Sequence, residues 1–442
     1  MPLTSRRYSW RTLPWPFLAL LIGAGLLRGG VLWLQADRLR DDPDRYSAFA
    51  RNLLRWGVYS SDERPDEFVE EERDLPEPSA FRPPLYPYLL ANAHLGLRTT
   101  TPLRIAVTHW LLGMATVLVV FDLGRRARLG AGAYVAAWLV ACDPILLQQS
   151  TLVMTETLAA FLAAVVLWTC TRYAERPEWF RVALIGGAVG LAALCRPTFL
   201  PWLALLALAL LLVGEIPFRR RALAAAACLL GAAVVLAPWG WRNYRELNLL
   251  SVTTTHGGYT LWLGNNPEFY AHLRAGKPLE SYEPQPPGMM QSAFDPIPFE
   301  IAYDNLCRHE AQAAMRAEPG MCAYACCYRL YQLVNPLPHP APKESFPRSC
   351  LRYAVAAWYV GVYLLAGFGL LAGRGELAKS PWIWGLTLCA AFAAVHTLYW
   401  TNLRMRAPLM PFVALVAAAG VKHLSEPFVH ANLLRRKNLR SC

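Results

Sequence analysis

The sequence predicts an all-α polytopic membrane protein that crosses the bilayer about ten times. Of its 442 residues, 55% are hydrophobic and only 17% are charged, a balance typical of integral membrane proteins rather than soluble domains. The apolar residues gather into segments of about 15 to 22 residues, enough for a helix to cross a hydrocarbon core of about 30 Å. These segments lie at residues 14–34, 103–123, 129–142, 155–170, 181–195, 198–214, 222–238, 352–373, 381–400 and 408–421.

Basic residues predict how the segments are oriented. They cluster at residues 5–11, 125–128, 171–181, 218–221, 373–379 and 433–440, which are the two ends of the chain and every second connection between segments. By the positive-inside rule, both termini and these connections are expected on the cytoplasmic side. The formal net charge of +12 therefore reflects topology and contact with the lipid bilayer, and it argues against a nucleic-acid partner.

The segments differ in length, which affects their interpretation. Those at 129–142, 155–170 and 181–195 are short enough to be re-entrant or buried helices. The first segment follows a basic start, as the apolar part of a secretory signal peptide does. Because its apolar run is too long and no small-residue cleavage site is evident, we expect it to remain as a membrane span.

Two long connections, residues 35–102 and 239–351, both face outward in this topology. The first is expected to carry juxtamembrane helices, and the second is a small extramembrane region with amphipathic helical spacing from Phe299 to Val334. The chain then divides into a transmembrane module with the first external loop at 1–238, an external juxtamembrane helical region at 239–351, and C-terminal transmembrane helices with a cytoplasmic tail at 352–442. Function is expected in the external connections.

Three acids stand at the exit of the first span, in "DDPDRYSAFARNLLRWGVYS" (41–60). A partly desolvated carboxylate of Asp41, Asp42 or Asp44 could accept a proton from a hydroxyl or amine. The alternative is structural, because Asp and Pro are ordinary residues at the start of a helix, and a short helix is predicted from Tyr46. Both interpretations stay open for each acid.

The same acids raise the question of a metal. The stretch "DPD" (42–44) resembles the D-x-D that holds a metal and a nucleotide-sugar in soluble glycosyltransferases, but nucleotide-sugars are cytoplasmic and this loop is external. A divalent cation such as Mg or Mn remains an option, since hard cations take carboxylate oxygens. No spacing of Cys and His residues suggests zinc, and no cofactor is otherwise indicated.

Arginines occur at the outer ends of spans, where the positive-inside rule disfavours them. They are Arg82 in "FRPPLYPYLL", Arg242 and Arg245 in "PWGWRNYREL", and Arg404 and Arg406 in "LRMRAPLMP". One explanation is anchoring to lipid headgroups. The other is a cradle for an external phosphate, which guanidinium geometry suits.

Further candidates lie at the same outer face. Glu156 begins a predicted helix, where it is either an ordinary first-turn acid or a second acid facing Asp42 across a site. Arg196 lies at an outer turn between two spans, and His256 and His396 are either substrate-binding or structural. No Walker loop, H-E-x-x-H, G-x-S-x-G or Rossmann fingerprint occurs in a credible context, so nucleotide hydrolysis is unsupported.

The order of these motifs resembles a known family. The acidic cluster with "RYSAFARNLL" comes first, followed by "FRPPLYPYLLA", "TLVMTETL", "CRP", "APWGWRNYRELN", "GGYTLWLGNNP" and "LRMRAPLMP". This set is similar to the GT-C type glycosyltransferases that use polyprenyl-phosphate sugars, specifically the bacterial relatives of protein O-mannosyltransferases and lipid A aminoarabinose transferases. The resemblance implies a bacterial inner-membrane enzyme, with its active site facing the periplasm and its catalytic module at 1–238.

The resemblance also implies roles for residues. The family has an acid four residues before a Tyr, which matches Asp42 before Tyr46, but Pro43 stands where a Glu often follows, so Asp44 or Asp41 could be the base instead. Glu156 matches a later family acid. The resemblance implies that Arg82 contacts the carrier phosphate, and Arg404 with Arg406 match the late R-x-R-x-P pattern of the family. The other expected substrate-binding residues are Tyr46, Tyr86, Arg196, Arg242, His256 and His396.

The expected reaction is an inverting sugar transfer. A polyprenyl-phosphate sugar is the donor, and a lipid, glycan or protein hydroxyl or amine is the acceptor. The carboxylate removes the acceptor proton while arginines stabilise the departing phosphate. The alternatives are a transporter or flippase of a lipid-linked anionic substrate, which would need ionisable groups near mid-membrane, and an inactive scaffold relative.

Overall fold

The computed structural model describes residues 15–62, 75–97, 99–213, 217–277, 279–284, 287, 299–340 and 344–438. Every regular element within these ranges is a helix, which confirms the predicted all-α membrane fold. Six helices are long and apolar enough to cross a membrane: α1 (Trp15–Leu34), α4 (Pro102–Arg126), α7 (Glu156–Glu175), α10 (Phe218–Leu247), α15 (Phe346–Ala372), and the helix formed by η6 (Leu403–Leu409) with the first part of α17 (Met410–Asn438). Together with the four shorter helices below, they cover all ten predicted segments.

The four shorter apolar helices are α5 (Gly132–Ala141), α8 (Trp179–Cys195), η3 with α9 (Pro197–Phe199 and Leu200–Leu212), and α16 (Trp382–Leu398). The prediction that 155–170 is short was wrong, because α7 continues to Glu175 and is long enough to span. Its last turn is polar, so the apolar run in the sequence ends before the helix does.

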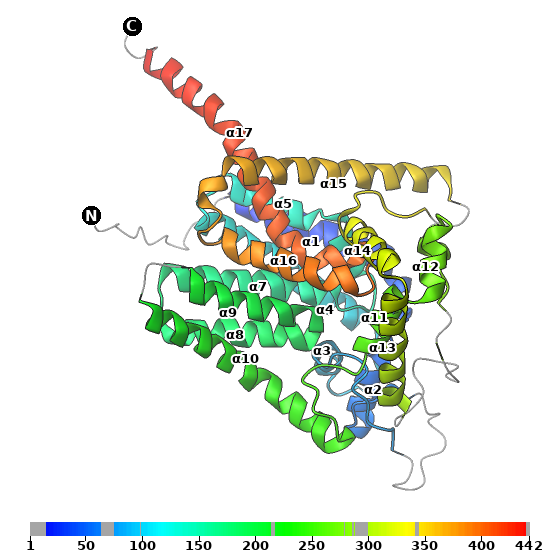
Figure 1. The fold of residues 1–442 in the computed structure, drawn as a ribbon. Coiled ribbons are helices and arrows are strands. Elements are labelled where there is room, and N and C mark those ends of the chain that lie inside the picture. Colours follow the sequence, from blue (N-terminus) through cyan, green and yellow to red (C-terminus); the bar gives the residue numbers. More distant parts are fainter. Residues whose placement is uncertain are drawn as a thin grey trace.

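The spans lie side by side across Figure 1, with α7, α8, α9 and α10 stacked in one group. Glycines allow the closest approaches. A side chain at Gly186 of α8 would overlap the Cys228 carbonyl oxygen of α10, and one at Gly231 of α10 would overlap the Ala183 carbonyl oxygen of α8. Small residues at such crossings let two helix backbones pack directly in a membrane.

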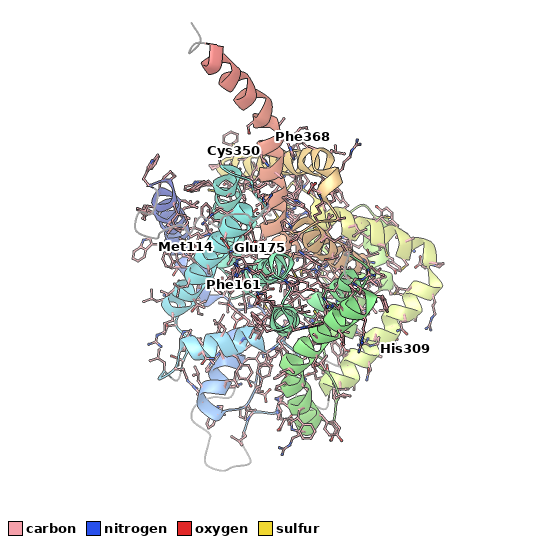
Figure 2. All side chains as sticks on the ribbon, turned by 90° about the vertical axis from the view of Figure 1, so that its left-hand side faces the viewer. Met114, Phe161, Glu175, His309, Cys350 and Phe368 are labelled. Carbon is pink, nitrogen blue, oxygen red and sulfur yellow. The ribbon has the colours of Figure 1, made fainter. Side chains whose placement is uncertain are left out.

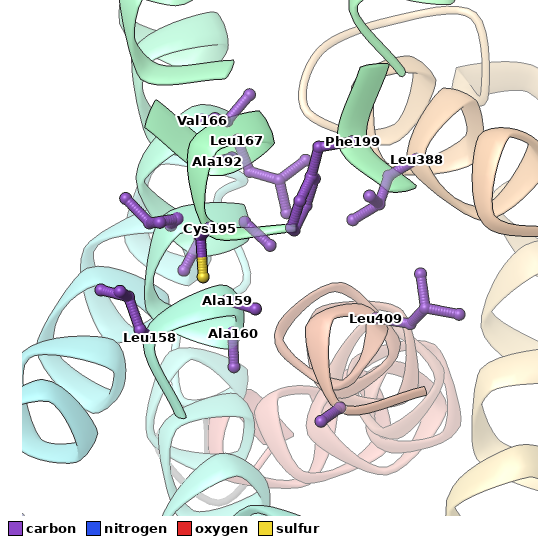
Figure 3. Close-up of a cluster of buried hydrophobic side chains, with 14 of the residues drawn as sticks. Leu158, Ala159, Ala160, Val166, Leu167, Ala192, Cys195, Phe199, Leu388 and Leu409 are labelled. Carbon is purple, nitrogen blue, oxygen red and sulfur yellow. The ribbon is translucent and has the colours of Figure 1, made fainter. Parts of the chain in front are cut away.

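The core surrounds α7. This helix packs against α4, α8, α16 and η6, and its face is rich in alanine. Figure 3 shows part of the cluster, with the labelled residues Leu158, Ala159, Ala160, Val166, Leu167, Ala192, Cys195, Phe199, Leu388 and Leu409. Because α7 is held on several sides, its first residue, Glu156, has a fixed place at one end of the bundle.

The helices outside the spans gather at that same end, on the right in Figure 1. They are η1 (Ala36–Arg40), α2 (Tyr46–Trp56), α3 (Leu85–Ala93), α11 (Gly257–Gly264), α12 (Pro267–Arg274), η4 (Leu279–Ser281), α13 (Phe299–Ala317) and α14 (Pro319–Val334). The short α6 (Pro144–Ser150) precedes α7, and η5 (Arg374–Glu376) lies at the other end. The short helix predicted from Tyr46 corresponds to α2, and α3 begins directly after Pro84.

Two boundaries differ from the expectation. The amphipathic stretch 299–334 is two helices, because Pro319 lacks an N–H and restricts Glu318 before it, so α13 ends and α14 begins there. In the other case a proline does not end a helix: α10 continues through Pro238 to Leu247, as membrane-span helices often tolerate proline. The division drawn after residue 238 therefore falls inside α10.

Candidate active site

A cavity of about 720 Å³ opens at the end of the bundle where the helices outside the spans gather. Its walls come from segments far apart in the sequence: residues 43–46, 81–83, 155–156, 195–201, 253–263 and 395–405 contribute, together with Arg308. The starts of α2 and α7, the turn between α8 and α9, and the end of α16 thus meet around one space. Such a concave site between helices is where a membrane protein binds small ligands.

Charged side chains of opposite sign alternate along one wall. Arg82 Nη2 lies 2.7 Å from Asp44 Oδ1, and Arg196 Nη1 lies 2.9 Å from Glu156 Oε1. Arg404 connects these two pairs: its Nη2 is 4.0 Å from Asp44 Oδ2, and its Nε is 3.5 Å from Glu156 Oε1. These five residues, which we call the ion-pair wall, carry three positive charges and two negative ones. It therefore has one positive charge left to attract an anion.

Arg82 is held rigidly in this wall. Its Nε donates to the Asp44 carbonyl oxygen at 3.2 Å, and its guanidinium lies over the rings of Phe81 and Tyr46. The Tyr59 hydroxyl lies 3.0 Å and 3.1 Å from the carbonyl oxygens of Arg82 and Pro83. The proline pair of the sequence therefore does more than start α3, since it fixes the backbone that presents Arg82.

Glu156 and Arg196 form the deeper part of the wall. Arg196 follows the last residue of α8, and its Nη1 and Nη2 donate to Thr155 Oγ1 and Met405 Sδ. The Glu156 side chain is only 2% exposed, and its Oε2 has no hydrogen-bond partner among the residues that the structure describes. A buried carboxylate is tolerable here because two guanidinium groups face its other oxygen.

Asp42 and Asp44 separate in the structure. The Asp42 carboxylate accepts hydrogen bonds from the backbone N–H groups of Tyr46 and Ser47, at 3.0 and 2.5 Å, and so caps the start of α2. Burial raises the pKa of Asp42, opposed by these hydrogen bonds. Asp44, not Asp42, is among the residues that line the cavity.

Three other predicted binding residues point away from the cavity. Arg406 donates to the Asn335 carbonyl oxygen and stacks on the Tyr359 ring at 4.0 Å. Arg242 donates to the carbonyl oxygens of Ser79 and Tyr59 at 2.7 and 3.2 Å.

The third is Tyr86, which is fully buried, with its hydroxyl 2.8 Å from His109 Nε2. His109 Nδ1 lies 2.7 Å from the Ser150 carbonyl oxygen. That oxygen can only accept, so His109 Nδ1 is the donor and Nε2 of the neutral ring accepts a hydrogen bond from the Tyr86 hydroxyl. The Tyr86 hydroxyl proton is therefore committed to a bond inside the protein. Tyr46, which contacts Tyr86 edge to face, does line the cavity.

Both predicted histidines line the cavity. His256 packs edge-on against Phe81 at 4.4 Å, and burial together with Arg82 lowers its pKa well below the ordinary value. His396 Nδ1 lies 2.8 Å from Thr401 Oγ1, and its Nε2 is buried with no hydrogen-bond partner in the described ranges. The lowered pKa favours the neutral imidazole of His256, which can form hydrogen bonds but carries no charge.

Sequence reasoning missed several residues that line the cavity: Arg308, Tyr259, Tyr399 and Trp400. Tyr259 lies in the motif "GGYTLWLGNNP", and Tyr399 and Trp400 lie a few residues before the motif that holds Arg404. Proximity to a motif was therefore a usable signal for these three residues. Arg308 gave none, because it is one of several charges on the amphipathic α13. Asp304 holds it, with Arg308 Nη2 2.9 Å from Asp304 Oδ2.

The wall does not fit a divalent cation. Metal binding between Asp44 and Glu156 would need both carboxylates to turn toward a shared ion, whereas each is paired with its own arginine and Arg404 reaches both. Within the described ranges, no group of three or more His, Cys, Asp or Glu side chains is arranged to hold a metal.

Comparisons with known proteins agree with this architecture. Residues 81–241, roughly a third of the chain, match the model of the dolichyl-phosphate-mannose-protein mannosyltransferase family. No curated protein sequence matches the chain.

Solved structures match over almost the whole chain. The oligosaccharyltransferase AglB from Archaeoglobus fulgidus, in complex with an inhibitory peptide and a dolichol-phosphate, matches with a TM-score of 0.53 at 15% identity, covering 97% of this chain and 52% of that one. Its apo form matches with a TM-score of 0.54 at 15% identity, covering 97% and 53%. ArnT from Cupriavidus metallidurans bound to undecaprenyl phosphate matches with a TM-score of 0.42 at 16% identity, covering 94% and 79%.

This protein spans about half the length of AglB, so the likeness concerns the fold of that half. The family match covers α3 to α10, which includes Arg82, Glu156 and Arg196 of the wall. Residues 81–241 therefore resemble the dolichyl-phosphate-mannose-protein mannosyltransferase family, and the chain shares the fold of about half of AglB.

Proposed function

We propose that the protein transfers a sugar from a polyprenyl-phosphate donor to an acceptor hydroxyl or amine. The observation that carries the proposal is the wall of Arg82, Asp44, Arg404, Glu156 and Arg196, which places a surplus positive charge beside two carboxylates. The AglB structure that shares this fold binds a dolichol-phosphate, which supports a lipid-linked donor. A phosphate set against the arginines leaves the lipid tail free to lie between the spans.

Asp44 is the proposed base. The sequence pattern pointed first to Asp42, but Asp42 caps α2 while Asp44 lines the cavity. The acceptor oxygen or nitrogen attacks the anomeric carbon, and the carbon–oxygen bond to phosphate breaks with its electron pair staying on the phosphate. The acceptor proton passes to Asp44, and one displacement inverts the anomeric carbon.

The arginines act on the leaving group. Arg82 and Arg404 both face Asp44, so a donor phosphate in the cavity next to this acid meets two guanidinium groups as its charge grows. Glu156 has a positioning role, since it lies between Arg196 and Arg404 and fixes both. The aromatic side chains of Tyr259, Tyr399 and Trp400 give the sugar and acceptor apolar surfaces to pack against.

We further propose that the reaction runs without a divalent cation, with Arg404 supplying the positive charge that a metal would otherwise provide. Transfer should then be unchanged when EDTA replaces Mg²⁺ or Mn²⁺ in the assay buffer. A requirement for either ion would contradict the role given to Arg404.

The test uses matched variants of the two acids. Membrane lipids and glycans of cells that lack the protein are compared by mass spectrometry with those of cells that express wild type, Asp44→Asn or Asp42→Asn. Loss of a base lowers transfer by about 10²- to 10⁴-fold, so Asp44→Asn should resemble the deletion. Asp42→Asn keeps one acceptor oxygen for α2 and should retain transfer at a stability cost of about 1 kcal/mol.

The outcomes separate the candidate functions. A transporter or a scaffold would work with Asp44→Asn as well as with wild type, provided that the variant is present at normal levels in the membrane. A glycan or lipid that changes on deletion but is restored by Asp44→Asn would overturn the assignment of the base. The proposed place of the enzyme is the bacterial inner membrane, with the cavity facing the periplasm.

A further inference from the structure

The lining of the proposed active site contains three buried polar atoms that the protein itself leaves unpaired. Glu156 Oε2, His396 Nε2 and Thr198 Oγ1 have no hydrogen-bond partner among the described residues, and all three residues line the cavity. Glu156 is 1% exposed and His396 is 2% exposed. Proteins pair nearly all of their buried polar atoms, so a group of unpaired atoms at one cavity points to a ligand that pairs with them.

The three residues come from elements that pack together. Glu156 begins α7, Thr198 lies in η3, and His396 lies in the last turn of α16, which packs against both α7 and η3. Arg196, directly before η3, lies 2.9 Å from Glu156 Oε1 and is close enough to His396 to interact with it electrostatically. Figure 2 looks along the bundle from the opposite end and shows Glu175, the last residue of α7, near the centre of the view. Glu156, at the other end of this central helix, therefore lies inside the molecule.

The hydrogen bonds of His396 make its Nε2 an acceptor. His396 Nδ1 lies 2.8 Å from Thr401 Oγ1, and that oxygen also lies 3.0 Å from the Tyr399 carbonyl oxygen and 3.3 Å from the His396 carbonyl oxygen. Carbonyl oxygens can only accept, so they take the single hydroxyl proton of Thr401, and Nδ1 donates to Thr401 Oγ1. In the neutral ring Nε2 then carries a lone pair and needs a donor from outside the protein.

Glu156 has the same need. Its Oε1 faces Arg196 Nη1 at 2.9 Å and Arg404 Nε at 3.5 Å, whereas Oε2 is the unpaired oxygen. A carboxylate oxygen accepts hydrogen bonds, and the Thr198 hydroxyl can accept or donate. Two acceptors repel the oxygens of a phosphate but bind groups that carry a proton. Sugar hydroxyls have this property, since each of them donates one proton and accepts as well.

The place of these atoms fits a sugar ring joined to the proposed phosphate. Arg404 contacts both Asp44 and Glu156, so a sugar whose phosphate lies at Arg404 has the Glu156 side of the cavity beside it. Tyr399 and Trp400, which follow His396 closely in the chain, also line the cavity. Aromatic rings beside a few well-placed polar atoms are the surroundings that orient a small ligand in a pocket.

We propose that Glu156 Oε2 and His396 Nε2 accept hydrogen bonds from hydroxyl groups of the donor sugar, and that His396 is a specificity-determining residue. The inference rests on the proposed function and names the class of donor: a polyprenyl-phosphate sugar with a free hydroxyl at the ring position that meets His396. A site built to bind a hydroxyl rejects a substrate that lacks it, because the buried acceptor is then left unpaired.

The test uses the purified full-length protein and membranes of cells that lack it, which supply the acceptor. Labelled polyprenyl-phosphate mannose, glucose and galactose are compared, and for the sugar that wild type transfers, analogues that each lack one hydroxyl are prepared. Removal of a hydroxyl also changes the reactivity of the donor, but this effect is common to all variants. Comparing each analogue between proteins therefore isolates the contact.

The variants separate the two nitrogens of the ring. His396→Asn keeps an N–H group for Thr401 but has no atom in the place of Nε2, whereas His396→Gln puts an amide oxygen near that place. The control is Thr397→Val, which removes the next hydroxyl of α16, a group that donates to the Ala393 carbonyl oxygen at 2.7 Å and does not line the cavity. Size-exclusion profiles and thermal unfolding establish that each variant is folded.

Wild type and Thr397→Val should transfer one analogue about 10- to 100-fold more slowly than the parent sugar, the effect of an unpaired buried acceptor. His396→Asn should transfer the parent more slowly by a similar factor and should no longer distinguish it from that analogue, while His396→Gln should recover part of the preference. A His396→Asn protein with the preferences of wild type, or one slowed equally on every donor, would overturn the inference and leave the proposed function intact. Transfer of none of the sugars by wild type would count against the proposed function itself, and the inference would fall with it.

Discussion

At the scale of single residues, the motif "LRMRAP" shows how neighbouring arginines take different roles. Arg404 and Arg406 lie two positions apart in η6, a 3₁₀ helix with about three residues per turn, so they leave it in different directions. Arg404 forms part of the ion-pair wall, whereas Arg406 is 2% exposed and contacts Tyr359 and Asn335. The motif predicted two phosphate contacts, and the structure places one of the two in the cavity.

This difference gives opposite predictions for matched variants. Arg404→Met should lower transfer by about 10²- to 10³-fold, as for other groups that stabilise transition-state charge. Its cost in stability should be smaller than that of Arg406→Met, because Arg196 still faces the buried Glu156. Arg406→Met should lower the free energy of unfolding by about 2 to 4 kcal/mol through the lost contacts to Tyr359 and the Asn335 carbonyl, while the folded fraction still transfers sugar. Transfer assays and thermal unfolding on the same preparations measure both effects. An Arg406→Met protein of normal stability without activity would contradict these roles.

His256 predicts a pH dependence of stability. Its pKa is lowered by burial and by Arg82, so between that folded value and about 6.5 the unfolded chain binds a proton that the folded protein does not. Stability from this residue is therefore complete above pH 6.5 and is lost as the pH falls, by about 1.4 kcal/mol per unit. His256→Gln should remove this slope between pH 7.5 and 5.5. The free energy of unfolding is measured for both proteins across this range. If it depends on pH in the same way for wild type and His256→Gln, the assignment is wrong.

The acidic cluster shows why the catalytic acid was hard to choose from sequence. Arg45 adopts a left-handed conformation with φ of 58°, which is unusual for a residue with a side chain. This turn folds the Asp42 carboxylate back onto the start of α2 and leaves Asp44 facing Arg82. The sequence D-D-P-D-R-Y does not predict a left-handed conformation at Arg45. Residue spacing alone therefore could not decide whether Asp42 or Asp44 is the catalytic acid.

At the scale of elements, α13 holds one side of the cavity through two acids on the same face. Glu300 accepts hydrogen bonds from the hydroxyls of Ser79 and Thr255 and from the Ala80 N–H, so it joins the two external connections. Asp304, one turn later, accepts from the N–H groups of Gly258 and Tyr259 at the start of α11. The start of α11, which carries Tyr259 and directly follows His256, is thereby fixed against α13.

Gly258 tests this contact. A Cβ atom at Gly258 would overlap the Asp304 carbonyl oxygen, so Gly258→Ala should force α11 from α13, lower stability by about 1 to 3 kcal/mol and reduce transfer. The control is Gly320→Ala in α14, where a Cβ atom has no neighbour within 4 Å and helix propensity should favour alanine by about 0.5 to 1 kcal/mol. Thermal unfolding and transfer are measured for both. Equal behaviour of the two variants would show that the α11–α13 contact does not support the site.

The spans themselves were largely predictable, since each apolar run of the sequence corresponds to a helix. Helix ends were less so, because they depend on proline in context: Pro319 separates two helices, while Pro238 lies inside one. Local chemistry is the same in both cases. The helix α10, which packs along α8 and α9, continues through its proline.

At the scale of the whole molecule, composition predicted the fold class, but the cavity could not be read from any segment. It is assembled from the connection 35–102, the ends of α7, α8, α9 and α16, the start of η6, and the connection 239–351, which includes α13. Motif order supplied Arg82, Glu156, Arg196 and Arg404 as candidates. Their meeting at one end of the bundle is a property of the packing of the spans, which glycine contacts such as that between α8 and α10 determine.

The orientation of the whole molecule in the membrane gives the last prediction. The cavity lies at the same end as the exposed Cys327 of α14, and Cys350 near the start of α15 is also exposed. If this end faces the periplasm, a membrane-impermeant maleimide should label wild type in intact cells with a permeable outer membrane, and the Cys327→Ser, Cys350→Ser double variant should lose most of that label.

The opposite end provides the control, because Arg374 of η5 is exposed there and belongs to a cluster of basic residues. Arg374→Cys, added to the double variant, should gain label only when the inner membrane is opened or inverted vesicles are used. Label on this variant in intact cells, with none on wild type, would place the cavity in the cytoplasm. A polyprenyl-phosphate donor presented at the outer leaflet could not then reach Asp44, and the proposed reaction would have to draw on a cytoplasmic substrate instead.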